Sequence, residues 1–308
     1  MKRMTKKIIF ITSALVLIGI SIYVIYINSH LRPHENLDVP YEEVNKGVID
    51  IEVEAVKSIT ENISSPIEIA ALIKEMGVPF NRDYLAPTEY VSGYSTNYAQ
   101  AFALGVFSAD LGYLNMYNKT GSVIDYLSTI KSLADNINVG QYFDFATLKR
   151  LASNSSNVDS LKYISVHSFN QIDQNLRQRK RGNLSALIIA GAWLEGIYIT
   201  IQVSKIKPEP RLLEKIGEQK IILSDLMTLL ASYAKDPIFK NYVNEFNTIK
   251  SKFDEVKITY EQGEPVTVIE NGMMTVVQKD RSVVHLTTQQ LNEISQTVEQ
   301  IRNRLIRQ

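Results

Sequence analysis

Residues 187–199 have the sequence LIIAGAWLEGIYI, and this stretch decides how the chain folds. It predicts an apolar helix over about 183–205. A second stretch of the same character, AFALGVFSADLGY at 101–113, lies in a helix predicted over about 96–118. Such helices become stable by burying apolar faces against other helices, so the two stretches predict a mainly helical core.

Each of these apolar stretches contains one carboxylate, Asp110 in the first and Glu195 in the second. Burying an unpaired carboxylate costs several kcal/mol, so each side chain needs hydrogen-bond donors, a cation or a raised pKa. One explanation is a structural network with tyrosines on the same helices. The other is a shared acid/base pair or half of a metal site. The sequence does not show whether the two carboxylates meet.

The ligand-binding interpretation gives a candidate set made of these two carboxylates and the aromatic side chains near them. Its members are Asp110, Tyr113, Tyr117, Trp193, Glu195 and Tyr198. The glycines in the same helices cost helix propensity, which close packing of backbones or space for a ligand would explain. They are Gly105, Gly112, Gly191 and Gly196. No catalytic residue is assigned.

Further helices follow from apolar residues that recur every three or four positions, from caps and from prolines. They are predicted over about 41–63, 66–76, 123–138, 142–153, 157–181, 211–234 and 237–256. Gly77 is expected to end the second of these in a left-handed conformation. The connection at 79–95 lacks a period but is rich in aromatic residues, so we expect it to pack over one end of the bundle and help to form a pocket.

The pattern changes near residue 256, where short β-branched segments replace the helical period. Strands are predicted at 256–260, 265–270, 273–278 and 282–286. Asn271-Gly272 between two of them is a strong hairpin signal. A closing helix should follow, capped by Thr287 or Thr288. The fold class is therefore mainly α: a multi-helix bundle with a small antiparallel hairpin or meander near the C-terminus and a closing helix, preceded by one N-terminal transmembrane helix.

That transmembrane helix is the uncharged run from Ile8 to Ile27. As a helix it is about 30 Å long, enough to cross the hydrocarbon of a bilayer. Four basic residues precede it, so we expect residues 1–7 in the cytoplasm and the remainder outside. A spacer at 28–40, a helical domain at 41–256 and a C-terminal part at 257–308 complete the predicted organisation. A cleaved signal peptide and a core helix are the alternatives.

The composition excludes several kinds of site. The chain has no cysteine, which excludes disulfides, thiolate zinc sites, a lipidated cysteine and a cysteine nucleophile. The 33 basic and 33 acidic residues balance, and four of the basic ones precede the anchor, so the remainder is acidic by four. We therefore expect no nucleic-acid partner. The basic patch Arg177, Arg179, Lys180 and Arg181 is either a solvated helix end or a contact for lipid headgroups or an acidic partner.

Motifs for bound groups are missing as well. There is no phosphate-binding glycine loop, glycine-framed serine or paired-histidine zinc motif, and Pro33 separates His30 from His34. The sequence predicts neither a metal nor a cofactor. It favours a protein that is not an enzyme, without excluding one.

Four stretches carry a resemblance to a known family. They are SPIEIAALIKEMGVPF (65–80), LGVFSADLGYLNMY (104–117), AGAWLEGIYI (190–199) and KIGEQKIIL (215–223). Through them most of the exported part resembles a family of bacterial cell-envelope proteins with no known activity. The resemblance implies a predominantly helical, exported protein. Members of the family are often lipoproteins, and this chain departs from that pattern because it has no cysteine.

The leading hypothesis is a single-pass protein of the cytoplasmic membrane with a periplasmic helical domain that binds another envelope protein as a scaffold or accessory subunit. The alternative is a small-ligand-binding protein or enzyme that uses buried Asp110 and Glu195. A transmembrane sensor is a third possibility, although seven cytoplasmic residues are too few for an output domain. The sequence names neither the partner nor the ligand.

Overall fold

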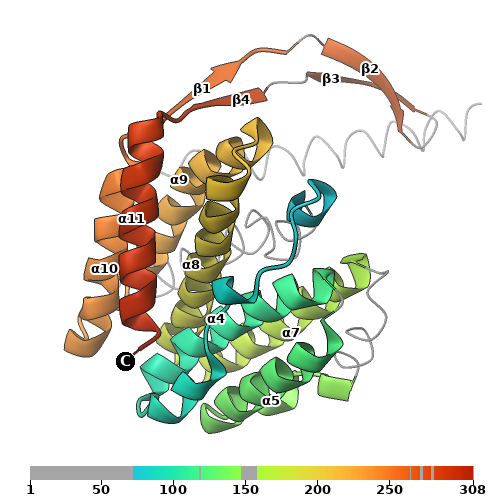
Figure 1. Cartoon of the computed structure of the whole chain (residues 1–308). Coiled ribbons are helices and arrows are strands. Elements are labelled where there is room, and N and C mark those ends of the chain that lie inside the picture. The colour runs from blue at the N-terminus through green and yellow to red at the C-terminus, as the bar shows by residue number, and fades with distance from the viewer. Residues whose placement is uncertain are drawn as a thin grey trace, which may run out of the picture. The chain divides into compact units, whose positions relative to one another are not determined.

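The computed structural model describes residues 72–117, 119–146, 158–263, 265–270, 273–278 and 281–307. These residues are mainly helical, with small antiparallel sheets near the C-terminus (Figure 1). The α-helices are α4 Asn97–Met116, α5 Thr120–Asn136, α7 Val158–Gln178, α8 Gly182–Ile206, α9 Pro210–Ala231, α10 Pro237–Phe253 and α11 Thr288–Leu305. Short 3₁₀ helices are η1 Arg82–Tyr84, η2 Thr88–Gly93 and η3 Gly140–Tyr142.

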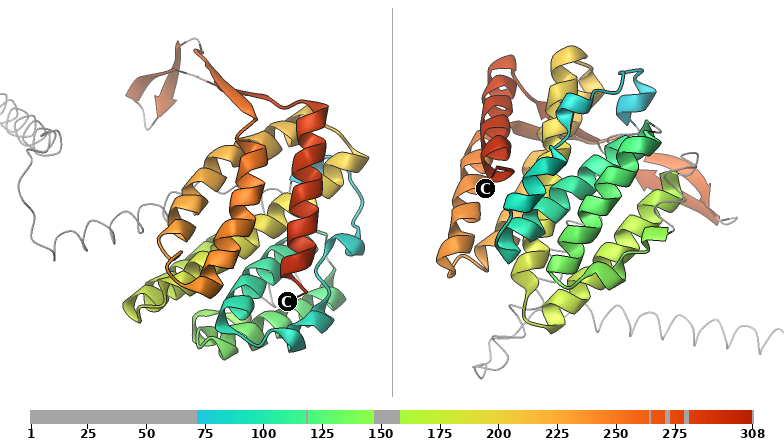
Figure 2. Two further views of the ribbon diagram at one scale, coloured as in Figure 1. Left: turned by 90° about the vertical axis from the view of Figure 1, so that its left-hand side faces the viewer. Right: turned by 60° about the horizontal axis from the view of Figure 1, so that its bottom comes forward.

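Helix α8, which contains the stretch 187–199, is the shared element of the bundle. It contacts α4, α7, α9 and α11. In both views of Figure 2, α10 and α11 lie side by side, and these two helices contact each other directly. Because neighbours cover so much of α8, nearly all of its side chains are buried. This explains why its sequence is apolar around the whole helix rather than along one stripe.

The backbones of α4 and α8 touch each other at two glycines. A β-carbon built on Gly105 would lie 2.0 Å from the carbonyl oxygen of Ile188, and one built on Gly191 would lie 2.1 Å from that of Phe102. No side chain fits at either place, so these glycines are required for close helix packing. We call Gly105, Gly191 and the backbone that they touch the glycine seam. The packing explanation is thus confirmed for these two glycines.

The connection before α4 is attached to the bundle by tyrosine side chains. Gly77 ends the preceding helix at φ 73°, the left-handed conformation that was predicted. The hydroxyl of Tyr117 donates to the Val78 carbonyl oxygen at 2.7 Å, and that of Tyr126 donates to the Ala86 carbonyl oxygen at 2.6 Å. The aperiodic segment after Gly77 therefore has fixed contacts with both α4 and α5.

The four predicted strands are present and form two antiparallel pairs. Strand β1 Lys257–Glu261 pairs with β4 Arg281–His285, and β2 Pro265–Glu270 pairs with β3 Met273–Gln278. The sequence left a hairpin or a meander open. Because β1 pairs with β4 across β2 and β3, the pairing is that of a hairpin within a hairpin, and each sheet has two strands among the described residues.

The closing helix α11 begins as predicted, with Thr287 as its cap. The Thr287 hydroxyl accepts from the Gln290 backbone N–H at 3.2 Å, while the Gln290 side chain accepts from the Thr287 N–H at 3.0 Å. This reciprocal pair is a capping box. Two predicted starts are wrong. Helix α5 begins at Thr120 rather than at 123, and Lys119 occupies the cap position without a side-chain hydrogen bond. The helix predicted at 142–153 does not begin at 142, because residues 143 and 144, which follow η3, are not helical.

Several predicted segments lie outside the described residues. They include the anchor Ile8–Ile27, the spacer at 28–40, the helix at 41–63 and the turn Asn271-Gly272. The helix predicted at 66–76 is described only from residue 72, and the one at 142–153 only to residue 146.

Candidate functional site

The structure brings the two core carboxylates together and adds an arginine. Glu195 lies in the middle of α8, and Arg302 comes from the last turn of α11. Arg302 Nε donates to Glu195 Oε2 at 2.8 Å and Nη2 donates to Oε1 at 2.5 Å, a two-point pairing. Glu195 is 0% exposed and Arg302 is 4% exposed. The carboxylate in the apolar helix therefore has its own buried cation.

Arg302 also makes contacts beyond Glu195. Its Nη2 donates to the Tyr84 carbonyl oxygen at 3.3 Å, and Nη1 donates to Asn303 Oδ1 at 3.2 Å. The guanidinium carbon lies 4.2 Å from the centre of the Tyr198 ring, which is a cation–π contact. One side chain of α11 thus links α8 to η1.

Asp110 of α4 completes the group, which we call the buried cluster: Asp110, Glu195 and Arg302. Asp110 Oδ2 accepts from the Ala86 N–H at 2.9 Å, and the charge of Glu195 acts on the Asp110 carboxyl group. Asp110 Oδ1 is buried and has no hydrogen-bond partner among the described residues.

Burial favours the protonated form of Asp110. It raises the pKa of Asp110 well above its ordinary value, and the nearby charge of Glu195 raises the pKa further, whereas Arg302 and the Ala86 N–H oppose the shift. With Asp110 protonated, the Arg302–Glu195 ion pair and one neutral acid give the buried cluster a net charge of zero. A dry core tolerates this arrangement far better than it would two carboxylates facing one arginine.

Tyrosine hydroxyls near the buried cluster make hydrogen bonds to backbone groups. Tyr94 donates to the Ile306 carbonyl oxygen at 2.7 Å, while the Tyr113 hydroxyl accepts from the Asn81 N–H at 3.2 Å. Burial raises the pKa of Tyr94 and, most strongly, that of Tyr126. The hydroxyls of Tyr94 and Tyr126 therefore stay neutral donors, and the three tyrosines together hold residues 78–95 and the end of α11 in place.

The six candidate residues fall into separate groups. Asp110, Glu195 and Tyr198 belong to or touch the buried cluster. Tyr113 and Tyr117 contact each other, with tilted rings whose centres lie 5.0 Å apart. Trp193 does not join them. Its Nε1 donates to Gln219 Oε1 at 2.9 Å, and its ring packs against Phe246 and Phe253.

Arg302 is the residue of the buried cluster that sequence reasoning missed. Arg302 was not among the candidate residues, and no role was assigned to it. The signal was its spacing: Arg302 follows Val298 by four positions and precedes Leu305 by three, which places it on the apolar stripe of α11. A charge on such a stripe needs a buried partner.

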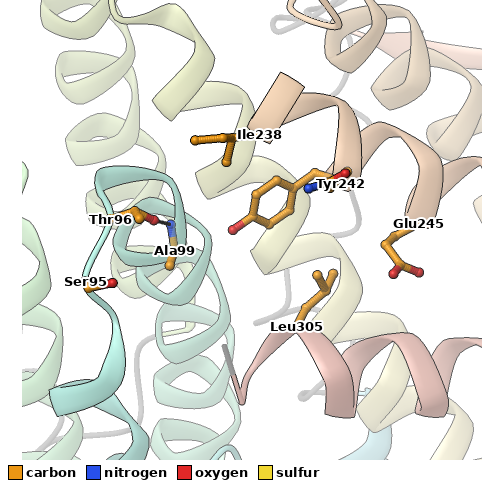
Figure 3. A pocket seen from close by; sticks show the side chains of 8 residues that line it. Ser95, Thr96, Ala99, Ile238, Tyr242, Glu245 and Leu305 are labelled. Carbon is orange, nitrogen blue, oxygen red and sulfur yellow. Dashed lines mark hydrogen bonds between the residues drawn. The ribbon is translucent and has the colours of Figure 1, made fainter. Parts of the chain in front are cut away.

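A pocket of about 270 Å³ lies between α4, α10 and α11 (Figure 3). Its lining residues are Ser95, Thr96, Ala99, Ile238, Asn241, Tyr242, Glu245 and Leu305. Burial raises the pKa of Tyr242 to about 12, and Glu245 accepts from Arg304 Nη2 at 2.5 Å. Residues 95 and 96 come from the end of the aromatic connection, but none of the six candidate residues lines this pocket.

Neither a metal cluster nor a free basic patch is present in the part of the chain that the structure describes. No three histidine, aspartate or glutamate side chains gather there in a way that could hold a metal. Arg177 Nε donates to Asp173 Oδ1 at 2.9 Å, and Arg181 Nη1 donates to the Ile137 carbonyl oxygen at 3.0 Å. Two of the four basic residues at 177–181 are therefore used inside the fold, and Arg179 and Lys180 stay exposed.

One described helix, α8, is long and apolar enough to cross a membrane, but 94% of its most apolar window is buried in the bundle. Length and composition alone would thus confuse this core helix with a membrane span.

The chain was compared with protein families, curated proteins and solved structures. No family model, curated protein or solved structure matches the chain, so the resemblance to the cell-envelope family receives no support from them.

Proposed function

We propose that the chain is a membrane-tethered helical module, placed on the outer side of the cytoplasmic membrane, that binds another protein of the cell envelope as a scaffold or accessory subunit. The observation that carries the tether is the uncharged run from Ile8 to Ile27 behind four basic residues. The spacer at 28–40 would keep the helical body close to the membrane. The chain remaining after the anchor is acidic by four, which disfavours nucleic acid as the partner, and we expect the partner to be a protein.

The described structure supports a binding role over a chemical one. The buried cluster has no open side: Glu195 and Asp110 are 0% exposed, and each makes its polar contacts within the fold. Arg302 holds α11 to α8, and Asp110 holds the Ala86 backbone to α4. The ionisable residues of the buried cluster thus fix the positions of helices. This is expected for a rigid domain that presents its surface to another protein.

The absence of cysteine makes the topology directly testable. A single cysteine at Tyr163, which is 70% exposed on α7, should react with a membrane-impermeant maleimide in intact spheroplasts. A matched cysteine at Thr5, ahead of the anchor, should react only after the cells are permeabilised. The tether is wrong if Tyr163→Cys needs permeabilisation, or if alkaline carbonate releases the intact chain from vesicles.

The partner is tested separately in the same cells. Crosslinking followed by gentle detergent extraction should recover the same second envelope protein in repeated preparations, and Tyr163→Cys should leave this recovery unchanged. Recovery of this chain alone, with correct topology, would reject the scaffold role and leave the tether in place.

A second candidate function is favoured by the pocket between α4, α10 and α11. A pocket of about 270 Å³ is near the lower limit for a small ligand, and its walls combine apolar and polar side chains. A ligand there would touch Thr96 and Glu245 but would not reach Asp110 or Glu195. Native mass spectrometry of the purified full chain should then show a bound small molecule that is lost in Ala99→Trp and kept in Gly121→Ala. An unliganded mass in both variants argues against this function.

A further inference from the structure

Strands β1 to β4 form a hairpin ribbon between α10 and α11, and its base, made by β1 and β4, is held against the helices. A β-carbon on Gly217 of α9 would lie 2.1 Å from Val284 Cγ1 of β4, so β4 lies directly against α9. Lys220 Nζ, also on α9, donates to the carbonyl oxygens of Asp254 at 2.9 Å and Val256 at 2.6 Å, just before β1. The base of the ribbon is therefore part of the helical body.

Among the described residues, the outer pair of strands, β2 and β3, has no comparable contact with the helices. Its extensive contacts are between its own two strands. The register pairs Val266 with Val277, Thr267 with Val276, Val268 with Thr275 and Ile269 with Met274. The paired residues are thus mainly apolar in sequence. A two-stranded hairpin is marginally stable in water, and stability requires a third strand or an apolar partner.

The two outer edges of this hairpin differ in a way that selects one of them for pairing. Strand β2 starts with Pro265, which has no backbone N–H, and ends with the charged Glu270. Proline and charge are the features that block pairing at exposed strand edges. Strand β3, MMTVVQ, has neither, whereas β1, β2 and β4 each contain a charged residue.

The geometry points to β3 as a self-association edge: we propose that two copies of this chain pair through antiparallel β3 strands across a two-fold axis near Thr275 and Val276. The two hairpins would then form one four-stranded sheet, which satisfies the backbone groups of both edges. An uncharged strand suits this arrangement, because a two-fold axis would place a charged residue near its own copy. A lipid occupant fits less well, since strand edges inside hydrocarbon leave backbone groups without partners.

Crosslinking of single-cysteine variants of the full chain in mild detergent tests this pairing. Thr275→Cys on β3 should give a covalent dimer with a short bis-maleimide, because the axis brings the two copies of residue 275 together. The matched control is Thr267→Cys on β2, a residue that lies opposite Val276 in the same hairpin. The control should crosslink several-fold less. Equal crosslinking of the two variants, or none in either, would overturn the proposal.

A second pair of variants tests the interface without a reagent. Val276→Lys adds a charge to the free edge, and Thr267→Lys adds one to the strand that is already blocked. Light scattering should show a dimer for the wild type and for Thr267→Lys, but a monomer for Val276→Lys. The melting temperature of the helical signal should be nearly the same in all three, which excludes unfolding as the cause of dissociation.

Other occupants give distinct outcomes, and each contradicts the proposal. A wild-type chain that stays monomeric, with Thr275→Cys crosslinked in cells to one other polypeptide, means that β3 receives a partner's strand. A monomer in which vesicle lipids protect Thr275→Cys from a water-soluble maleimide means that the hairpin lies in the bilayer. These results are independent of the topology test at Tyr163, so a failure of this proposal and a failure of the membrane tether can be told apart.

Discussion

At Gly105 and Gly191 the backbones of α4 and α8 touch with no side chain between them, whereas at Asp110 and Glu195 the same two helices face each other through ionisable groups. The glycine seam uses close approach and tolerates nothing larger than hydrogen. The buried cluster depends on a third helix, because Arg302 comes from α11. The first contact is complete within the pair of helices, and the second is complete only when α11 is docked.

Removing the arginine should have the largest effect. Arg302→Met leaves Glu195 charged and buried without its cation, which typically costs about 3–5 kcal/mol in the free energy of unfolding. Urea denaturation followed by fluorescence of Trp193, the single tryptophan, measures the loss. The double variant Glu195→Met with Arg302→Met should be less destabilised than Arg302→Met alone, since it removes both charges. A double variant that is less stable than Arg302→Met would show that Glu195 stabilises the fold even without its cation, which contradicts this expectation.

The glycine seam should be the next most sensitive place. Gly191→Ala puts a methyl group 2.1 Å from the Phe102 carbonyl oxygen, so α4 and α8 must separate, at an expected cost of about 1–3 kcal/mol. Gly121→Ala is the matched control, because its β-carbon would have no neighbour within 4 Å. That substitution should leave stability equal or slightly higher. Similar losses in both variants would mean that the seam is less tightly packed than described.

Two tyrosines near the buried cluster should respond differently to loss of the hydroxyl group. Tyr126→Phe leaves the buried Ala86 carbonyl oxygen without the hydroxyl that donates to it, and the expected loss is about 1–2 kcal/mol. The Tyr84 hydroxyl is buried and has no hydrogen-bond partner among the described residues. Tyr84→Phe should therefore be neutral or stabilising. Thermal unfolding of both variants by circular dichroism checks the order, and a Tyr84→Phe protein that is the less stable one contradicts it.

The effect that is smallest in acid concerns the carboxyl group of Asp110, and it depends on pH. Its folded-state pKa is raised above the ordinary value of 3.8, so the folded chain retains a proton that the unfolded chain releases. The contribution of Asp110 to stability is thus fully present in acid and is lost as the pH rises above 3.8 towards the raised pKa. Asp110→Asn keeps the hydrogen-bond geometry and cannot ionise.

The variant should differ from the wild type by about 1 kcal/mol or less near pH 4, where a neutral amide replaces a neutral acid. Its stability relative to the wild type should then increase as the pH rises to about 8. Urea denaturation over this pH range measures the difference, in which the contributions of all other carboxylates cancel. A difference that is constant or falls with pH would show that Asp110 is ionised in the fold.

Much of the fold is predictable because it follows from local signals. The apolar stretches gave α4 and α8, the capping residues gave the start of α11, and the β-branched runs gave all four strands. Pairing of β1 with β4 was not predictable, because β-branched composition marks a strand without choosing its partner. The start of α5 was missed because no side chain caps it.

The sequence identified the two carboxylates of the candidate site but neither their proximity nor Arg302. Asp110 and Glu195 stand out because carboxylates are rare in apolar helices, but a single sequence does not say that residues 85 positions apart meet. Arg302 is 107 positions from Glu195 and sits among other charged residues of an amphipathic helix. Trp193 was grouped with Glu195 by proximity in sequence, yet the two side chains point to different neighbours. The ligand-binding role of the six residues stays a prediction.

The distance in sequence between Glu195 and Arg302 has a consequence for synthesis and export. In a chain that crosses the membrane as proposed, α8 reaches the translocon while its counterion is still 107 residues behind it. By length and hydropathy α8 could then be released sideways into lipid. An acidic residue at the middle of a helix opposes such release. Glu195 would thus act twice, first as a signal that lets α8 pass through the channel and later as the docking point for the end of the chain.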